Sequence, residues 1–405
     1  MIIRGGTVVT ARGVEVADVA IEDGQITAVG RDLNADGEEV DARGLYVFPG
    51  GIDSHVHFNE PGRTEWEDVA HGSTALAAGG YTCFVDMPLN SLPVTTTVEA
   101  FDLKLSAMKR SSRLDFGLWG GLVPGNLDQL GPLVERGVMG FKAFMCPSGI
   151  DEFPAANEET LREGMKRIAD IDSILLVHAE DPSLLREPKG PSARDFVESR
   201  PPEAEVSAIE RCVALSQKTG CRVHIVHVSS TAGADLLGAD MSGETCPHYM
   251  LYTEDDLERL GGPGKCAPPL RAERMTMMPI VVSDHSPSTL DLKEGGDFRK
   301  IWGGISGCQS TRQLLLAMDG VELKNVAAAT STNIARRFRI LDKGDIAPGF
   351  DADLWIVDLN HEDVVRREDL FYKNPFSAHE GGRIRGRTVT TMHGSPKFIR
   401  PAGRS

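Results

Sequence analysis

Long apolar runs are missing from this 405-residue sequence. No stretch approaches the roughly 18 consecutive apolar residues that a membrane-spanning helix needs, and the first 24 residues include the acidic Glu15 and no unbroken apolar segment. The sequence therefore predicts neither a membrane span nor a secretory signal. Basic charge is also scarce, because 43 Lys and Arg stand against 59 Asp and Glu, a formal net charge of −16. This negative balance argues against nucleic acids and anionic membranes as partners.

Cysteine is too sparse and too irregularly spaced for a disulfide framework. The seven cysteines are scattered, odd in number and contain no C-x-x-C pair, which favours a reducing, cytoplasmic location. Aromatic residues fill only 6% of positions, but the hydrophobic fraction of 41% is ordinary for a globular protein. The 43 glycines therefore indicate many tight turns in a folded chain rather than disorder.

Two kinds of periodicity divide the chain. At both ends, apolar and polar residues alternate in short runs, with an Asp23-Gly24 turn signal in the first of them, and this pattern predicts β-hairpins. The middle instead alternates apolar strands with helical stretches, one of them expected at 65–78. Eight strands are expected there, at 52–55, 82–85, 116–119, 138–145, 174–178, 223–228, 244–251 and 280–283.

Eight strand–helix units in roughly 250 residues match the size of a TIM barrel. The sequence therefore predicts an α/β fold, with a (β/α)8 TIM barrel over residues 50–338. The β pattern on either side predicts a small, discontinuous β-sandwich domain, formed by residues 1–49 and 339–405 together.

The first chemical signal is the H-x-H motif of His55 and His57, at the end of the first barrel strand. Side chains at i and i+2 share a strand face, so two imidazoles can converge on one metal ion. Taken alone, the motif is as well explained by a chance pair of surface histidines.

Three further polar residues end apolar strands: His178, His227 and Asp284. A single strand histidine is more often a satisfied core or rim residue than a ligand. However, the functional residues of a TIM barrel gather at the C-terminal ends of several strands, and here that end collects four histidines and a carboxylate. Such nitrogen and oxygen donors suit zinc and other first-row divalent ions.

Lys142 stands between two phenylalanines on a predicted barrel strand. Its amine either reaches solvent or has its pKa lowered by burial and by nearby metal charge. A neutral amine can take up carbon dioxide, and the resulting carbamate is an anion that can bridge two metal ions. Lys142 follows His57 by 85 residues and precedes His178 by 36, which places the predicted ligands on strands 1, 4, 5, 6 and 8.

These residues resemble the cyclic amidohydrolases of the amidohydrolase superfamily, which include dihydroorotase, dihydropyrimidinase or hydantoinase, and allantoinase. The resemblance covers essentially the whole chain, including the segment GDIAPGFDADL at 344–354. It implies that His55, His57 and Asp284 hold one metal, that His178 and His227 hold the other, and that carboxylated Lys142 bridges them. Zinc is the first choice, and cobalt or manganese would fit the same ligands.

The similarity is greatest to the allantoinase branch. It rests on four segments, NEPGRTEWE at 59–67, DMPLNS at 86–91, SDHSP at 283–287 and WGGISG at 302–307. Dihydroorotases usually carry an arginine two residues after the H-x-H motif to grip a substrate carboxylate. This chain has Asn59 there, which suits allantoin, a neutral ring without a carboxylate.

The resemblance implies hydrolysis of allantoin to allantoate. Two metal ions would activate a bridging water and polarise the scissile carbonyl, and Asp284 would act first as the base and then as the acid. A dihydropyrimidinase or hydantoinase is the main alternative, since it shares every ligand. A dihydroorotase fits less well because Asn59 stands in place of the usual arginine. A non-catalytic, dihydropyrimidinase-like scaffold fits less well because the ligand set is complete.

Several other residues are weaker candidates. Possible substrate contacts, for which structural roles are equally well supported, are Asn59, Asn90, His248 and Cys266. Asp53 is expected to orient a histidine ligand. By analogy with relatives, the protein is expected to be a homo-oligomer, specifically a tetramer. Three connections are short for the family, at 181–195, 231–242 and 269–280.

Overall fold

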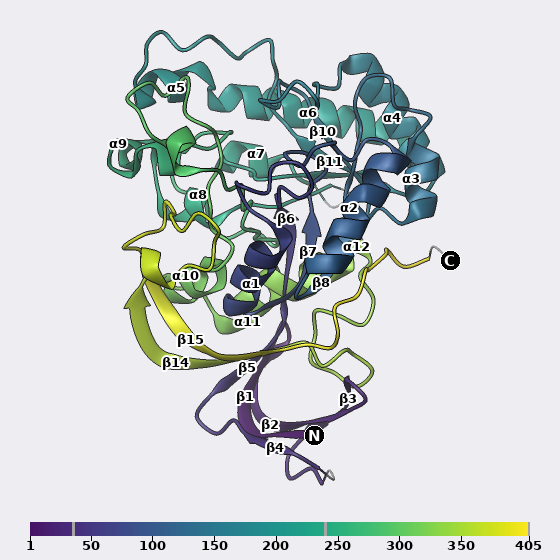
Figure 1. The fold of residues 1–405 in the computed structure, drawn as a ribbon, viewed down its shortest axis with the longest axis vertical. Helices are drawn as coiled ribbons and strands as arrows, with labels where there is room; N and C mark the ends of the chain where they lie inside the picture. Colours follow the sequence, from purple (N-terminus) through teal and green to yellow (C-terminus); the bar gives the residue numbers. More distant parts are fainter. Residues whose placement is uncertain (35–36, 239–240, 404–405) are drawn as a thin grey trace.

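The middle of the chain forms a ring of strands in a computed structural model, which describes residues 1–34, 37–238 and 241–403 (Figure 1). The strands of the ring are β6 (Gly51–Val56), β7 (Tyr81–Asp86), β8 (Asp115–Leu118), β9 (Gly120–Gly121), β10 (Phe141–Phe144), β11 (Ile174–His178), β12 (Arg222–Ile225) and β13 (Ser242–Gly243). β8 and β9 together make the third strand, which is interrupted at Trp119.

Every pairing within the ring is parallel. One sheet has the order β6-β7-β8 and the other β13-β12-β11-β10-β9. The segment that follows residue 280 closes the ring through isolated parallel bridges, from Thr245 to Val281 and from Val56 to His285. The predicted eight-stranded barrel is therefore confirmed.

The longer helices lie on the outside of the ring (Figure 1). The helices are α1 (Val69–Ala78), α2 (Val98–Ser111), α3 (Leu130–Arg136), α4 (Glu158–Asp170), α5 (Ala193–Ser199), α6 (Pro202–Thr219), α7 (Thr231–Asp235), α8 (Pro247–Leu251), α9 (Leu257–Leu260), α10 (Thr311–Ala317), α11 (Leu323–Ala327) and α12 (Asn333–Phe338). Shorter turns of 3₁₀ or π type lie at Glu254–Asp256, Gly262–Gly264, Leu290–Lys293, Ala328–Thr332 and Arg367–Asp369. Within the described ranges, no helix is long and apolar enough to cross a membrane.

Local chemistry explains where the structure departs from the predicted elements. The helix expected at 65–78 begins only at Val69, because Asp68 caps it by accepting a hydrogen bond from the backbone N–H of His71. The strand expected at 244–251 is wrong, because β13 ends at Gly243, only Thr245 forms an isolated bridge, and α8 begins at Pro247. Proline favours the first turn of a helix because it lacks the N–H that would be unpaired there.

Both ends of the chain build one small β domain. Its strands are β1 (Ile2–Thr10), β2 (Gly13–Glu22), β3 (Gln25–Gly30), β4 (Glu39–Asp41), β5 (Tyr46–Pro49), β14 (Leu354–Val364) and β15 (Arg383–Met392). They form a seven-stranded sheet in the order β15-β14-β5-β1-β2-β3, with β4 paired to β1. The antiparallel pairing of β5 with β14 joins the two ends, and residues such as Ile3, Val47 and Leu354 form its own core. The predicted β domain from both termini is thereby confirmed.

The three short connections carry little regular structure. The stretch 231–242 contains only the five-residue α7 and the first residue of β13, and its residues 239–240 lie outside the described ranges. The stretch 269–280 contains no helix or strand, although all of it is described.

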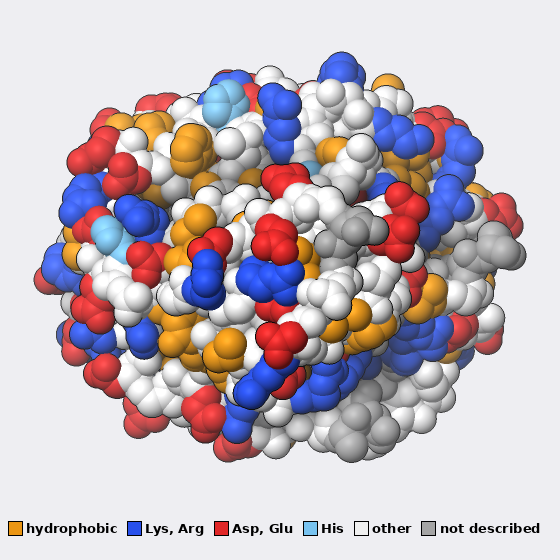
Figure 2. All heavy atoms as spheres, turned by 90° about the horizontal axis from the view of Figure 1, so that it is seen from below, with side chains coloured by type: hydrophobic (Ala, Val, Ile, Leu, Met, Phe, Trp, Pro, Cys, Tyr) orange, Lys and Arg blue, Asp and Glu red, His pale blue; other side chains and the backbone are white. Residues whose placement is uncertain are grey.

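Figure 2 shows the molecule from below, with acidic and basic side chains interspersed on the described part of that face rather than gathered into one basic area.

A buried cluster of charges links the β domain to the barrel. Lys343 Nζ lies 2.5 Å from Asp115 Oδ2 at the start of β8, and 2.9 and 2.7 Å from carboxylate oxygens of Asp351 and Asp353 ahead of β14. The side chains of Lys343, Asp115 and Asp353 are each about 5% exposed or less. Lys343 therefore compensates three carboxylates, of which Asp351 is also 3.7 Å from Lys397 Nζ.

Replacing Lys343 with methionine is expected to lower the free energy of unfolding by about 3–5 kcal/mol, because it leaves buried carboxylates without a partner. Urea denaturation measures the change. Lys324→Met is the matched control, since Lys324 pairs with Glu322 on the surface, where an ion pair stabilises little. Equal effects of the two variants would contradict the structural role of the cluster.

Candidate metal centre

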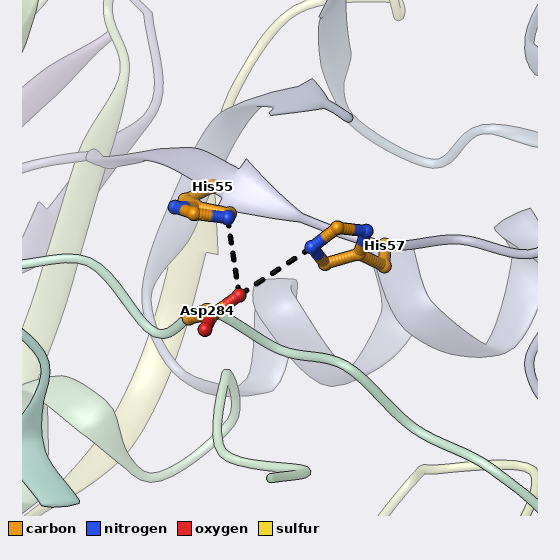
Figure 3. A group of neighbouring side chains, drawn as sticks. All are labelled: His55, His57 and Asp284. Carbon is orange, nitrogen blue, oxygen red and sulfur yellow. Dashed lines mark ion pairs between the residues drawn. The ribbon is translucent and has the colours of Figure 1, made fainter. Parts of the chain in front are cut away.

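Two histidines from the first barrel strand converge on one carboxylate. His55 lies in β6 and His57 directly follows it, so their side chains share the face that points into the barrel mouth. The Nε2 atoms of His55 and His57 lie 3.1 and 3.4 Å from Asp284 Oδ1. Figure 3 shows both imidazoles directed at this carboxylate from the same strand. These three residues form one half of the candidate centre.

The second half is a pair of histidines from the fifth and sixth strands. His178 ends β11 and His227 lies just past β12. His178 Nδ1 and His227 Nε2 approach to 3.0 Å, and Phe144 stacks on His178 with 4.5 Å between the ring centroids. The ring centroids of His227 and His55 are 5.5 Å apart, so the two halves are adjacent.

Lys142, in β10, is fully buried beside them. Its Nζ lies 5.0 Å from the centroid of the Phe144 ring and has no hydrogen-bond partner among the described residues. Burial lowers the pKa of Lys142 to about 8, which raises the neutral fraction of the amine above that of an exposed lysine. All six predicted ligands line one cavity of about 400 Å³.

The chemistry of this donor set fits a divalent cation. Burial lowers the pKa values of His55, His178 and His227, which keeps the imidazoles in the neutral form that binds metals. Ring nitrogens in this cavity face each other or a carboxylate, and a buried amine lies beside them without a partner among the described residues. A bound cation would satisfy their lone pairs. His55, His57 and Asp284 also each offer one donor atom within 4.8 Å of the others.

Two of these residues have a strained backbone conformation. His227 and Asp284 have φ angles of 38° and 46°, in the left-handed region that non-glycine residues rarely adopt. Such conformations persist only where the surroundings hold them and are concentrated at functional sites. His227 follows β12, and Asp284 follows the segment that closes the ring through isolated bridges.

The structure separates the four weaker substrate candidates into two pairs. Asn90 and Cys266 line the same cavity as the six polar residues. Asn59 and His248 are outside its lining and are buried, and their side chains have no hydrogen-bond partner in the described part of the chain.

Asp53, which is expected from the sequence to orient a histidine ligand, bonds the backbone of one such histidine and of a neighbouring segment. Its Oδ1 accepts hydrogen bonds from the backbone N–H groups of His55, at 3.2 Å, and Ser283, at 3.3 Å. It therefore ties together the two backbone segments that carry His55 and Asp284.

Sequence reasoning missed two buried glutamates that contact the predicted ligands. Glu180 Oε2 lies 2.7 Å from His178 Nε2, and Glu244 Oε1 lies 2.6 Å from His55 Nδ1. Burial alone would raise the pKa of Glu180, but the charge of Arg200 and the contact with His178 hold it well below its usual value. The spacing His178-Ala179-Glu180 was the one local signal for this contact.

A loop forms one wall of the cavity and is held by two buried lysines. Lys265 Nζ donates to the backbone carbonyls of Phe298 and Ile301, and Lys293 Nζ donates to those of Trp302 and Gly304. Trp302 and Gly304 themselves line the cavity. Both amines thus bond the backbone of the loop rather than a ligand.

Comparison with known proteins identifies extensive similarities. The model of the Amidohydrolase family matches residues 46–389. A protein from Solibacter usitatus named allantoinase is 48% identical over 418 residues, covering 96% of this chain and 92% of that protein. One of the same name from Rubrobacter xylanophilus is 48% identical over 420 residues, covering 97% and 92%. The structure of the L-hydantoinase (dihydropyrimidinase) from Arthrobacter aurescens superposes with a TM-score of 0.93 at 29% identity, covering 98% of this chain and 96% of that one.

Proposed function

The chain belongs to the amidohydrolase family, and we propose that it hydrolyses the ring amide of allantoin to give allantoate. The observation that carries this proposal is the 48% identity over nearly the whole chain to proteins named allantoinase. The cavity supports it, because it contains every side chain that a binuclear amidohydrolase centre of the predicted kind requires.

In this proposal His55, His57 and Asp284 would hold one divalent ion, and His178 and His227 would hold the other. Lys142, carboxylated by carbon dioxide, would supply an anionic ligand to the centre. Zinc is the first choice, although cobalt and manganese suit the same donors. Such ions lower the pKa of a bound water and polarise the scissile carbonyl.

Asp284 is the residue that moves the proton. Its side chain is 14% exposed and lines the cavity, so it can reach both the attacking water and the substrate. It takes a proton from the water as the carbon–oxygen bond forms, and it returns that proton to the ring nitrogen as the carbon–nitrogen bond breaks. One residue thus serves as the base and then as the acid.

Three basic side chains that line the cavity are engaged by the protein itself. Arg200 is paired with Glu180, and Arg299 is paired with Asp297. Lys265 donates to backbone carbonyls. Lys300 also lines the cavity. The contacts of the first three side chains agree with a substrate ring that carries no carboxylate.

A substrate panel tests the proposal. Protein loaded with zinc in the presence of bicarbonate is expected to hydrolyse allantoin with a kcat/KM about 10²-fold or more above that for dihydrouracil, hydantoin or dihydroorotate. Turnover of dihydrouracil or hydantoin without turnover of allantoin would instead establish the dihydropyrimidinase alternative, which the similarity to the L-hydantoinase structure favours. Metal-loaded protein that hydrolyses none of these compounds would indicate a scaffold.

Two further expectations concern the setting of the enzyme. All seven cysteines are free and buried, which supports a reducing compartment such as the cytoplasm. A homotetramer stays a prediction, which sedimentation measurements would test.

A further inference from the structure

We propose that Glu180 and Glu244 are positioning residues that fix the tautomer of one histidine in each half of the metal centre. This inference rests on the binuclear centre proposed above, but not on the identity of the substrate. Both glutamates are completely buried, and each has a carboxylate oxygen within 2.7 Å of a nitrogen of a predicted ligand. Neither carboxylate is among the six predicted ligands.

A neutral imidazole has one N–H donor and one lone pair, and a carboxylate can only accept. Glu180 therefore selects the tautomer of His178 that carries its proton on Nε2. The lone pair of His178 is then on Nδ1, the atom that lies 3.0 Å from His227 Nε2. The carboxylate thus ensures that the unprotonated nitrogen faces the centre.

The other half uses the opposite nitrogen. His55 donates from Nδ1 to Glu244, which leaves the lone pair on Nε2, the atom 3.1 Å from Asp284 Oδ1. In contrast, the Nδ1 atoms of His57 and His227 have no hydrogen-bond partner among the described residues. Each half of the centre therefore contains one histidine whose outer ring nitrogen contacts a glutamate and one whose outer nitrogen has no such partner among the described residues.

The two glutamates are held by different partners. Arg200 donates to both oxygens of Glu180, with Nε 3.1 Å from Oε1, so this carboxylate belongs to a buried ion pair. Arg200 is fixed in turn, since its carbonyl accepts a hydrogen bond from Arg271.

Glu244 is held by a relay, which here means the hydrogen bonds that link it through the neutral His224 side chain to Ser242. His224 donates from Nε2 to Glu244 Oε2 over 3.0 Å, and its Nδ1 accepts from the hydroxyl of Ser242 over 2.7 Å. Burial raises the pKa of Glu244, whereas the charge of Lys142 and the backbone N–H of His227 favour its ionised form. The relay also fixes the tautomer of His224.

Glutamine is the diagnostic substitution at both positions. It keeps the shape of the side chain, but its NH₂ group can donate to the imidazole and so stabilise the wrong tautomer. In that tautomer an N–H, rather than a lone pair, faces the centre. A glutamate that merely filled buried space would not produce this effect.

The experiment measures zinc binding to Glu180→Gln and Glu244→Gln by competition with a chelator, with thermal unfolding as a check on folding. Each variant is expected to bind one of two zinc equivalents about 10–100-fold more weakly. Glu205→Gln is the matched control, because Glu205 is equally buried but bonds the hydroxyls of Ser229 and Ser230. The zinc affinity of Glu205→Gln should stay within about threefold of wild type, a smaller change than the loss expected of the other two variants. Wild-type affinity for both equivalents in both glutamine variants would overturn the proposal.

A second measurement needs no variant. Nitrogen NMR of the wild-type histidines is expected to show the proton of His178 on Nε2 and the proton of His55 on Nδ1, and the reverse tautomers would overturn the proposal. Neither measurement uses allantoin. A protein with these tautomers that fails to hydrolyse allantoin would refute the proposed function and leave the positioning roles intact.

Discussion

Replacing Lys142 with alanine is expected to lower kcat/KM by about 10³-fold or more and to reduce the bound metal below two equivalents, because the bridging anion is lost. The structure supplies the reason. The Lys142 amine is buried without a hydrogen-bond partner among the described residues, and burial lowers its pKa to about 8. Its neutral form can add to carbon dioxide, forming a nitrogen–carbon bond and releasing a proton, and the product is an anion.

Metal analysis and intact mass spectrometry check this prediction. Wild-type protein loaded with zinc and bicarbonate should gain the mass of one carbon dioxide molecule, and Lys142→Ala should not. Lys324→Ala, at an exposed lysine, is the control and should keep both the modification and the activity. Loss of metal from Lys142→Ala without loss of activity would refute the binuclear mechanism, and a bare amine in fully active, metal-replete protein would refute the carbamate.

The barrel and its six polar residues could be predicted because their signals are local. An apolar strand is visible in sequence, and a histidine at its end, such as His178 after Ile174–Val177, needs no knowledge of distant residues. Parallel strands then bring their C-terminal ends together. This rule about topology, rather than any known contact, is the reason that Lys142 was predicted to lie near His55 and Asp284.

The contacts that were not predicted depend on precise placement in space. Glu244 is 189 residues from His55 along the chain, and nothing in either local sequence indicates their pairing. Asp53 was expected to orient a histidine ligand, but the sequence did not indicate that its carboxylate also bonds the backbone of the distant segment at Ser283. The strand predicted at 244–251 was wrong because Pro247 is compatible with both a strand end and a helix start, and only α8 itself decides between them.

Asp284→Asn is expected to reduce kcat by about 10²–10⁴-fold, the usual contribution of a general acid–base group, with little change in KM. An amide has the size of the carboxylate but cannot accept a proton from the attacking water. The substitution suits the backbone as well, because residue 284 has a φ of 46° and asparagine tolerates this region better than most residues. The variant should therefore fold and keep the position of the side chain.

Steady-state kinetics at several zinc concentrations separates the two roles of Asp284. If the loss came only from weaker metal binding, excess zinc would restore kcat, whereas loss of proton transfer persists at saturation. Asp319→Asn is the control, since the Asp319 side chain is fully exposed, and its kcat should equal that of the wild type. A zinc-saturated Asp284→Asn variant with wild-type kcat would assign proton transfer to another group. Activity that stays low at every zinc concentration would support both proposed roles of Asp284, as a metal ligand and as the residue that carries the proton from water to the leaving nitrogen.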